Sequence, residues 1–320
     1  MNALATDALV HIVMPVYNGM PFLPRAIESL LAQTHTRFEV WFGDDGSTDG
    51  SLEYLRTIAD PRFHLVLGKS GGGLFQNLNR LLESVEAPYT RILCQDDWLE
   101  PQCLERELDF FEARPSLAMI FSKHCAMSGD GALLSETALG DLPAVLPPQL
   151  AVQHFFYHGC IPGNLSAVTL RTSILRGMGG FDPAFTVSGD YELWARIAAH
   201  YPLGVVHERL VAIRTHAGQL SRASASMVPF IRQNALVRRA LLPFMPKHLR
   251  HEIEEFEIRR HRVLDFHQAL YCLRSLRWPE AGAIFSQIGR KDLPRVAAAW
   301  VATLNNRRRP QAPWVMAALP

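Results

Sequence analysis

The 320-residue chain lacks any apolar run approaching the roughly 18–20 residues that a membrane-spanning helix needs. Its start, from Met1 to Val10, lacks the basic stretch and the following apolar stretch of a secretory signal peptide. Its five cysteines are odd in number and form no Cys-x-x-Cys pair, so neither a disulfide framework nor a zinc knuckle is expected. These absences favour a reducing, cytoplasmic setting.

A strong charge imbalance is also missing, because the formal net charge is only +1, and this argues against nucleic acid as a partner. The charge is nevertheless unevenly distributed. Residues 225–320 carry 16 Lys and Arg against 7 Asp and Glu, a balance of +9, which leaves −8 for the rest. This asymmetry predicts an acidic N-terminal domain, residues 1–222, and a basic C-terminal region, residues 223–320, where a helical pattern begins after Ser221.

Short apolar segments and amphipathic segments alternate along the first hundred residues. The predicted strands cover residues 9–16, 38–42, 63–67 and 89–94, and the helices between them cover 22–33, 49–58 and 74–85. A further helix is expected to begin near Pro101. This alternation is typical of βαβ units, so we predict an α/β fold with a mostly parallel sheet flanked by helices.

Beyond residue 125 the pattern is less regular. Gly, Pro and Ser are frequent over residues 128–164, which suggests a long surface excursion or a lid. Regular structure is expected again around residues 163–170, in a helix over 190–200 and in a strand over 209–214. After Ser221 the chain is predicted to be helical to about residue 305.

Polar clusters follow three of the predicted strands, at residues 15–18, 44–48 and 95–97. Ligands of such sheets bind at the carboxyl ends of the strands, so the three clusters are expected to form one site. In the third cluster, adjacent carboxylates of Asp96 and Asp97 repel each other unless a cation lies near them. Oxygen ligands suit Mg²⁺ or Mn²⁺, although a helix cap before Pro101 is the alternative explanation.

The other two clusters allow more than one interpretation from the residues alone. Asp45 is suited to accept hydrogen bonds from a ligand, but the same segment also has the pattern of a turn and a helix cap. A glycine-rich loop that includes Gly71 precedes a helix that contains Asn77, and loop amides at a helix start favour an anion. No Gly-x-Gly-x-x-Gly segment follows the first strand, which counts against a dinucleotide enzyme.

Taken in order, several segments resemble the family 2 glycosyltransferases, which have the GT-A fold. They are Met14-Pro15-Val16-Tyr17-Asn18, Ser29 to Thr34, Phe38-Glu39-Val40, Asp44 to Asp49, Asp96-Asp97, Gly179 to Asp182, Gly189 to Arg196, and Arg214 to Ser221. The resemblance spans roughly residues 9–222. It implies a GT-A-type, Rossmann-like domain that takes its sugar from a nucleotide-sugar.

The resemblance also implies a role for individual residues of the nucleotide and metal site. Tyr17 is expected to pack on a uracil base, and Asp45 to accept a hydrogen bond from it. Asp96 is expected to contact ribose. Asp97 is expected to bind the metal, with His216 completing the metal or diphosphate site. Pro15 is expected to line the base pocket with Tyr17, and further expected donor contacts are Asn18, Gly71 and Asn77.

Asp190 lies at the start of a predicted helix, where a plain N-cap is the simplest explanation of its residue type. The resemblance implies instead that Asp190 is the catalytic base. Family members commonly have Glu before this Asp, whereas this chain has Gly189. An acceptor contact that such a Glu would make is therefore not expected here.

The function implied by the resemblance is inverting transfer of a sugar from a nucleoside-diphosphate sugar, most simply a UDP-sugar, to an acceptor hydroxyl. The expected cofactor is Mn²⁺ or Mg²⁺. The expected acceptor is a glycan or a lipid-linked molecule in bacterial polysaccharide, lipopolysaccharide or other glycan assembly. The basic region 223–320 either packs as a solvated appendage or contacts an anionic membrane from the cytoplasmic side.

Two alternatives belong to other classes of function. A sugar nucleotidyltransferase shares the sheet type and uses a divalent metal, but usually carries a basic Gly-rich loop after the first strand. Here that position holds Pro15 to Gly19, which contains no basic residue. The other alternative is a protein that binds a nucleotide-sugar without turning it over.

Overall fold

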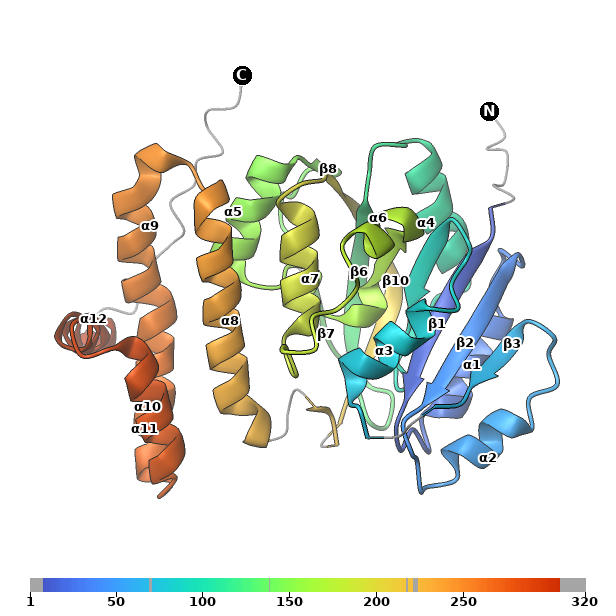
Figure 1. The fold of residues 1–320 in the computed structure, drawn as a ribbon, viewed down its shortest axis with the longest axis horizontal. Helices are drawn as coiled ribbons and strands as arrows, with labels where there is room; N and C mark the ends of the chain where they lie inside the picture. The colour runs from blue at the N-terminus through green and yellow to red at the C-terminus, as the bar shows by residue number, and fades with distance from the viewer. Residues whose placement is uncertain (1–7, 69–70, 138, 217, 221–223, 306–320) are drawn as a thin grey trace. The chain divides into compact units, whose positions relative to one another are not determined.

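The computed structural model describes residues 8–68, 71–137, 139–216, 218–220 and 224–305 (Figure 1). The chain forms two compact units, Met1–Gln219 and Leu220–Pro320. The boundary predicted from composition lies between residues 222 and 223. No helix in the described ranges is long and apolar enough to cross a membrane.

One mixed sheet organises the first unit, with strands in the order β3-β2-β1-β4-β9-β6-β10-β5. β7 pairs with β6 and β8 pairs with β10 beside this path. The strands are β1 (Val10–Val16), β2 (Phe38–Asp44), β3 (Phe63–Val66), β4 (Tyr89–Ile92), β5 (Trp98–Leu99), β6 (Met119–Ser128), β7 (Leu133–Glu136), β8 (Val145–Leu146), β9 (Val168–Arg171) and β10 (Leu203–Thr215). β1 to β4 pair in parallel, as do β6 and β10, which confirms the mostly parallel sheet predicted from the sequence.

Helices cover both faces of the parallel strands. Those of the first unit are α1 (Leu23–Leu31), α2 (Ser51–Arg56), α3 (Leu74–Leu82), α4 (Cys103–Glu112), α5 (Pro148–His158), α6 (Thr172–Gly177) and α7 (Gly189–Ala198), with the 3₁₀ turn η1 (Leu165–Ala167). The even-numbered side chains of β1, such as Ile12 and Met14, share one apolar core with α1 and α4. On the opposite face, Leu81 of α3 packs over Gly43 of β2. Because both faces are covered, ligands have access mainly at the strand ends.

The amphipathic spacing predicted over residues 22–33 explains why α1 forms and where it packs. Leu23, Ile27 and Leu30 repeat at helical spacing and are each at most 3% exposed. Each such buried side chain contributes roughly 1.5–3 kcal/mol. Pro24 lies in the first turn, where its missing N–H costs nothing. α1 therefore brings the loop that follows β1 back over the sheet edge.

The predicted surface excursion over residues 128–164 is wrong in one respect, because this segment contains regular structure. It holds β7, β8 and α5, and it begins at the end of β6. The four residues of β7 are all exposed, so they show no apolar alternation that could mark a strand. α5 buries six of its eleven residues, so its sequence has no clear polar face.

The second unit is helical, as predicted for residues up to about 305. Its helices are α8 (Met227–Leu241), α9 (Arg250–Phe256), α10 (Val263–Arg274), α11 (Trp278–Ile288) and α12 (Leu293–Asn305), with the π-helical segment η6 (Glu257–Arg262) between α9 and α10 and the 3₁₀ turns η3 (Ser224–Ser226), η4 (Leu242–Phe244) and η5 (Lys247–Leu249). Ile231, Cys272 and Ile284 belong to one of its apolar clusters. Ile258, Val263 and Ile288 belong to another.

Candidate active site

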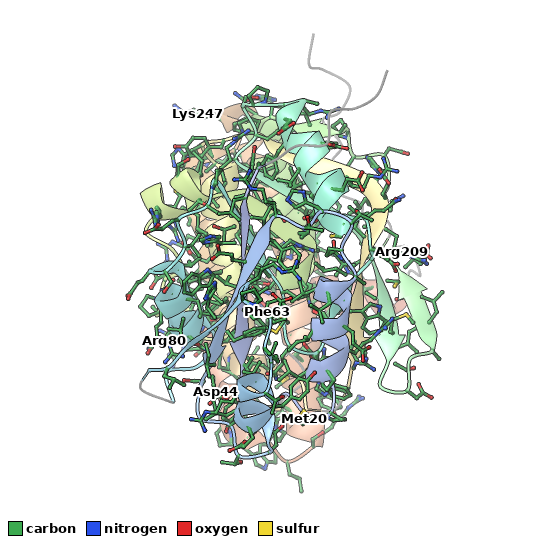
Figure 2. All side chains as sticks on the ribbon, turned by 90° about the vertical axis from the view of Figure 1, so that its right-hand side faces the viewer. Met20, Asp44, Phe63, Arg80, Arg209 and Lys247 are labelled. Carbon is green, nitrogen blue, oxygen red and sulfur yellow. The ribbon has the colours of Figure 1, made fainter. Side chains whose placement is uncertain are left out.

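The loops that follow β1, β2 and β4 meet at the carboxyl edge of the sheet. The Gln95 side chain accepts a hydrogen bond from Tyr17 N at 2.7 Å and donates one to Tyr17 O at 2.8 Å. Asn18 N donates to Ser47 Oγ at 2.9 Å, and Asn18 Oδ1 accepts from Thr48 N at 2.9 Å. Figure 2 labels Met20 and Asp44, which lie toward the lower end of this edge. The three polar clusters seen in the sequence are therefore neighbours in space.

Tyr17 and Pro15, both expected at the base pocket, have different environments. The Tyr17 residue is 60% exposed, so its ring is accessible to a flat partner. Pro15 is buried inside β1, where it lies opposite Gly43 of β2. Pro15 therefore lies beneath this loop and not on the exposed surface of the loop.

Asp45 and the glycine-rich loop are joined by a fan of backbone hydrogen bonds. Asp45 Oδ1 accepts from Gly71 N at 2.9 Å, and Asp45 Oδ2 accepts from Gly73 N at 2.9 Å. Gly72 N adds a longer bond of 3.3 Å to Oδ1. Gly71 has φ +88°, a conformation that favours glycine. The loop amides thus point at a carboxylate of the protein itself.

Asn77 does not face this edge, in contrast to the donor contact expected of it. Its residue is 4% exposed, and its Nδ2 donates to Gly43 O at 2.5 Å. Its Oδ1 accepts from Arg80 at 2.6 Å. Because both ends of the amide are used inside the protein, Asn77 belongs to the framework that joins α3 to β2. A side chain at position 43 would collide with it.

The adjacent carboxylates of Asp96 and Asp97 have opposite surroundings. Asp97 is 1% exposed; its Oδ2 accepts from Ser166 Oγ at 2.6 Å and its Oδ1 from Arg214 N at 2.9 Å. Burial, followed by the charge of Asp96, raises the pKa of Asp97 well above its ordinary value. Both Asp97 oxygens thus serve to lock the loop after β4 onto two distant segments.

Asp96 is partly exposed and pairs with the histidine predicted for the metal site. Asp96 Oδ2 lies 3.0 Å from His216 Nε2, and their side chains are 15% and 22% exposed. The His216 ring also packs on Phe22, with centroids 4.6 Å apart. The structure therefore brings together one carboxylate and one imidazole at an accessible position. This favours Asp96, rather than Asp97, as the partner of His216 in any ligand set.

Cys94 completes this group of potential ligands. Its Sγ and carboxylate oxygens of Asp96 and Asp97 all lie within 4.8 Å of one another. Burial raises the pKa of the Cys94 thiol well above its ordinary value, and the carboxylates of Asp97, Asp96 and Asp190 raise it further. Asp190 is thus close enough to Cys94 for its charge to influence the thiol.

Two residues that hold the site were not singled out from the sequence. Ser166 accepts from Cys94 N at 2.9 Å while it donates to Asp97, and its carbonyl accepts from the buried Arg91 at 2.6 Å. Arg214 donates from Nε to Asp96 O at 3.2 Å, and its guanidinium lies over the Phe22 ring. Neither residue type signals this role, because the partners are far apart in the chain.

Asp190 lies in the first turn of α7 and is partly buried. Its Oδ1 accepts from Tyr191 N at 2.8 Å, and its Oδ2 lies 3.9 Å from Cys160 Sγ. Burial raises the pKa of Asp190, which makes its carboxylate a better proton acceptor. A Cβ added at Gly189 would lie 2.9 Å from the ring of Phe75. The ring therefore occupies the space that a larger residue before Asp190 would need.

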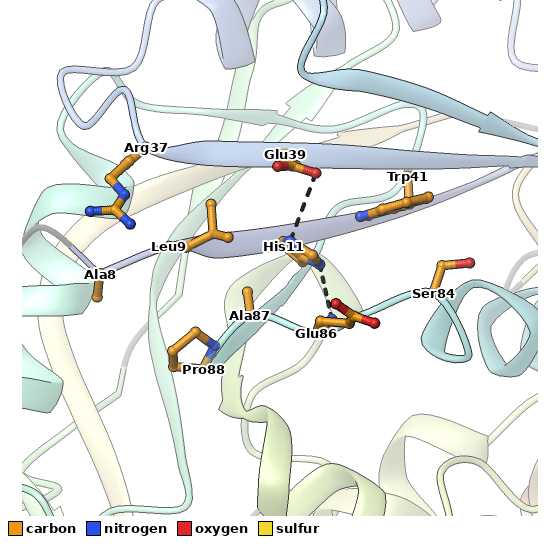
Figure 3. Close-up of a pocket in the computed structure, with 10 residues that line it drawn as sticks. All are labelled: Ala8, Leu9, His11, Arg37, Glu39, Trp41, Ser84, Glu86, Ala87 and Pro88. Atoms are coloured by element: carbon orange, nitrogen blue, oxygen red, sulfur yellow. Dashed lines mark hydrogen bonds and ion pairs between the residues drawn. The ribbon is translucent and has the colours of Figure 1, made fainter.

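A separate hollow of about 780 Å³ lies beside the amino ends of β1 and β2, away from the carboxyl edge of the sheet (Figure 3). There His11 Nδ1 accepts from Glu86 N at 3.2 Å, and His11 Nε2 lies 3.9 Å from Glu39. Burial lowers the pKa of His11. The hollow is at the amino ends of β1 and β2, so it is remote from the carboxylates described above.

Comparison of the chain with known proteins finds a matching protein family. Residues 11–158 match the model of the glycosyl transferase family 2. An uncharacterised glycosyltransferase of Rickettsia prowazekii is 26% identical over 231 residues, which cover 69% of this chain and 68% of the relative. The chain is thus similar to glycosyltransferase family 2 over residues 11–158. This similarity indicates a transferase, as expected from the resemblance.

Solved structures support the GT-A fold. TarS 1–349 of S. aureus in complex with UDP-GlcNAc has a TM-score of 0.64 and 15% identity, covering 92% of this chain and 88% of that one. A mannosyltransferase of Pyrobaculum calidifontis in complex with GDP-Man and Mn²⁺ has a TM-score of 0.53 and 15% identity, covering 93% and 81%. At these identities the likeness concerns the fold alone.

Proposed function

We propose that this glycosyltransferase moves a sugar from a nucleoside-diphosphate sugar, by preference a UDP-sugar, to an acceptor hydroxyl with inversion at the anomeric carbon. The observation that carries this proposal is the cluster of Cys94, Asp96 and Asp97 after the end of β4, with His216 bonded to Asp96. Asp190, whose pKa is raised by burial, supplies a separate carboxylate. Acid–base chemistry and charge stabilisation are what a single-displacement transfer requires.

In the proposed reaction the acceptor oxygen attacks the anomeric carbon from the face opposite the diphosphate. The new carbon–oxygen bond forms while the bond to the diphosphate oxygen breaks and takes its electron pair with it. The hydroxyl proton passes to an oxygen of Asp190. The raised pKa of Asp190 favours this transfer, because burial has already destabilised the free carboxylate.

The residues present fit a divalent cation. Asp96 and His216 offer an oxygen and a nitrogen donor at an accessible position, and both donor types suit Mn²⁺, whereas Mg²⁺ prefers oxygen. When bound, such an ion supplies positive charge to the diphosphate of the donor and of the departing product. Asp97 would support it indirectly, by fixing the loop that carries Asp96.

The donor's nucleoside is proposed to lie on the loops after β1 and β2. Tyr17 supplies an exposed ring for the base, and Asp45 supplies a carboxylate for a base N–H. Asn18 and Gly71 hold the surrounding loops in place through their backbone contacts. This arrangement supports the proposed UDP-sugar, because uracil has an N–H group that can donate a hydrogen bond to a carboxylate.

The test of the proposed base is Asp190→Asn. We expect turnover to fall by about 10²–10⁴-fold, because the positioned proton acceptor is lost. Donor binding should persist, because Asp190 is not one of the proposed donor contacts. The measurement is release of nucleoside diphosphate, together with donor-induced thermal stabilisation.

A matched control is Asp109→Asn on α4, where burial also raises the pKa of the carboxyl but no site residue is in contact. Its turnover should equal that of the wild type. Wild-type turnover in Asp190→Asn would contradict the proposed base. A nucleotidyltransferase would instead release pyrophosphate from a nucleoside triphosphate and a sugar phosphate. A binding protein would show donor stabilisation without product for every acceptor.

The acceptor is proposed to be a glycan or lipid-linked hydroxyl in bacterial polysaccharide, lipopolysaccharide or other glycan assembly. The basic C-terminal region, with 16 Lys and Arg against 7 Asp and Glu over residues 225–320, supports contact with an anionic membrane on its cytoplasmic side. Such contact would place the enzyme beside lipid-linked molecules without a spanning helix.

A further inference from the structure

The segment between α5 and β9 reaches both groups of carboxylates. At its C-terminal end Ser166 holds Asp97. Near its N-terminal end Cys160 lies against Asp190, with Sγ 3.9 Å from Oδ2. Ser166 is part of the framework already described. Cys160 has no role in that framework, although it contacts the carboxylate proposed as the base.

Local backbone geometry fixes where the Cys160 side chain points. α5 ends at Gly159, whose φ of +80° favours glycine and turns the chain sharply. A second turn follows, in which Gly163 N donates to Cys160 O at 3.0 Å. Cys160 is thus held between two turns, and its thiol is directed at Asp190 by the backbone rather than by a flexible side chain.

The direction of the hydrogen bond follows from the protonation states. Burial, followed by the charge of Asp190, raises the pKa of Cys160 well above its ordinary value, so the thiol remains protonated. The S–H therefore donates and the Asp190 carboxylate accepts. The other Asp190 oxygen accepts from the backbone N–H of Tyr191. Asp190 is consequently held at both oxygens, by one firm donor and one weak donor.

We propose that Cys160 is a positioning residue for Asp190, which holds the carboxylate in the orientation that receives the acceptor's proton. This inference rests on the proposed role of Asp190 as base. A thiol suits the task because it is a weak donor. It fixes the side-chain rotation yet leaves the carboxylate oxygen basic enough to accept a proton.

Other residues at position 160 would lose either the orientation or the basicity of the Asp190 carboxylate. Alanine would leave Oδ2 without its neighbour, so that the carboxylate could rotate away from the acceptor. Serine would restore a donor, but a stronger one, which stabilises the charged carboxylate and lowers its basicity. The two variants therefore separate orientation from basicity. Cys94 is another titratable group near Asp190, and it is unchanged in both variants.

The experiment measures kcat and donor KM across pH for Cys160→Ala and Cys160→Ser. For Cys160→Ala we expect kcat to fall roughly ten- to hundredfold with donor KM unchanged, because misorientation of a reacting group costs rate rather than binding. For Cys160→Ser we expect partial recovery of kcat and an acid limb displaced to lower pH. The acid limb of Cys160→Ala should move to higher pH.

Cys125→Ala is the matched control, because Cys125 is also buried but its Sγ contacts Val211 O, away from Asp190. It should retain wild-type kcat and pH profile. A Cys160→Ala enzyme with wild-type kcat and an unmoved acid limb would overturn the inference. So would equal losses of kcat and donor binding in both Cys160 variants, since a merely structural role would produce that result.

Failure of this inference is distinguishable from failure of the proposed base. If Asp190→Asn retains turnover, Asp190 is not the base, whatever Cys160 does. If Asp190→Asn is inactive and Cys160→Ala is unaffected, only the positioning role fails. When both roles hold, adding Cys160→Ala to Asp190→Asn should cause no further loss, because the two residues act as one unit.

Discussion

Asp96 and Asp97 are identical residues at adjacent positions, but their side chains have different partners. Asp97 is turned inward and accepts hydrogen bonds from Ser166 and Arg214, which are 69 and 117 residues away in the chain. Asp96 is turned outward to His216. Because both Asp97 oxygens accept hydrogen bonds within the protein, Asp96 is the more accessible of the two carboxylates.

Substitution of each carboxylate by its amide should therefore have a different result. Asp96→Asn is expected to abolish stabilisation by Mn²⁺ together with UDP, because a charged donor of the outward pair is lost. Asp97→Asn is expected to keep that response but to lower the free energy of unfolding by about 1–3 kcal/mol, because an amide oxygen replaces only one of two buried acceptors.

Thermal unfolding with and without Mn²⁺, UDP and chelator measures both effects. The reverse outcome, in which only Asp97→Asn loses the Mn²⁺ response, would restore the metal role that was predicted for Asp97 from the sequence. The resemblance predicts ribose contact for Asp96 and metal binding for Asp97, but it does not reveal the partners of Asp97, which come from η1 and β10. Ser166 and Arg214 carry no residue pattern that predicts contact with Asp97.

At the scale of single elements, the turn between α10 and α11 contains a residue in an unfavourable conformation. Leu276 has φ +57° and is 74% exposed. Its neighbour Arg277 donates its backbone N–H to Cys272 O at 2.8 Å, which closes the last turn of α10. This closure usually has glycine at the left-handed position. Leu276 therefore carries backbone strain without burying its side chain.

We predict that Leu276→Gly stabilises the protein by about 1 kcal/mol, because it relieves the left-handed strain. The matched control is Leu264→Gly, in a helical part of α10 and also exposed, which should cost about 1 kcal/mol. Urea unfolding monitored by the helical signal measures both changes. Equal destabilisation by the two substitutions would show that Leu276 makes a stabilising contact.

Elements were predicted well where their apolar spacing is regular and poorly where burial is uneven. β1 to β4 and α1 to α4 follow from regular apolar spacing. β10 was predicted only over 209–214 but begins at Leu203, because exposed residues at 207–209 interrupt its apolar pattern. Its register against β6 shifts at the same place. A local irregularity of the strand therefore concealed its first half.

The whole molecule divides its charge between its two parts. Residues 225–320 carry +9 and the remainder −8, while the total stays near neutral. Net charge alone therefore conceals a strongly basic region. Each Lys or Arg close to an anionic lipid surface contributes about 1 kcal/mol of attraction. The distribution predicts oriented attraction to such a surface rather than general adhesion.

We predict that the full chain binds vesicles containing phosphatidylserine, that binding falls as salt rises, and that zwitterionic vesicles are not bound. Reversal of the exposed pair Arg290→Glu and Lys291→Glu should weaken binding at least tenfold. The control reverses Arg56 and Arg106, exposed residues of the first unit, and should leave binding unchanged. Sedimentation with vesicles measures the bound fraction. Equal losses in both double variants would contradict an oriented surface.

The hydrogen bonds from the Gly71–Gly73 amides to the Asp45 carboxylate have a consequence for donor recognition. A uracil N–H that binds Asp45 would add to a carboxylate that already accepts three loop amides, because its two oxygens have about four lone-pair sites. Nucleotide capture at this position is then an addition to a carboxylate that the loop has already oriented. The ordering of that side chain is complete before the base arrives, so base binding loses little side-chain entropy.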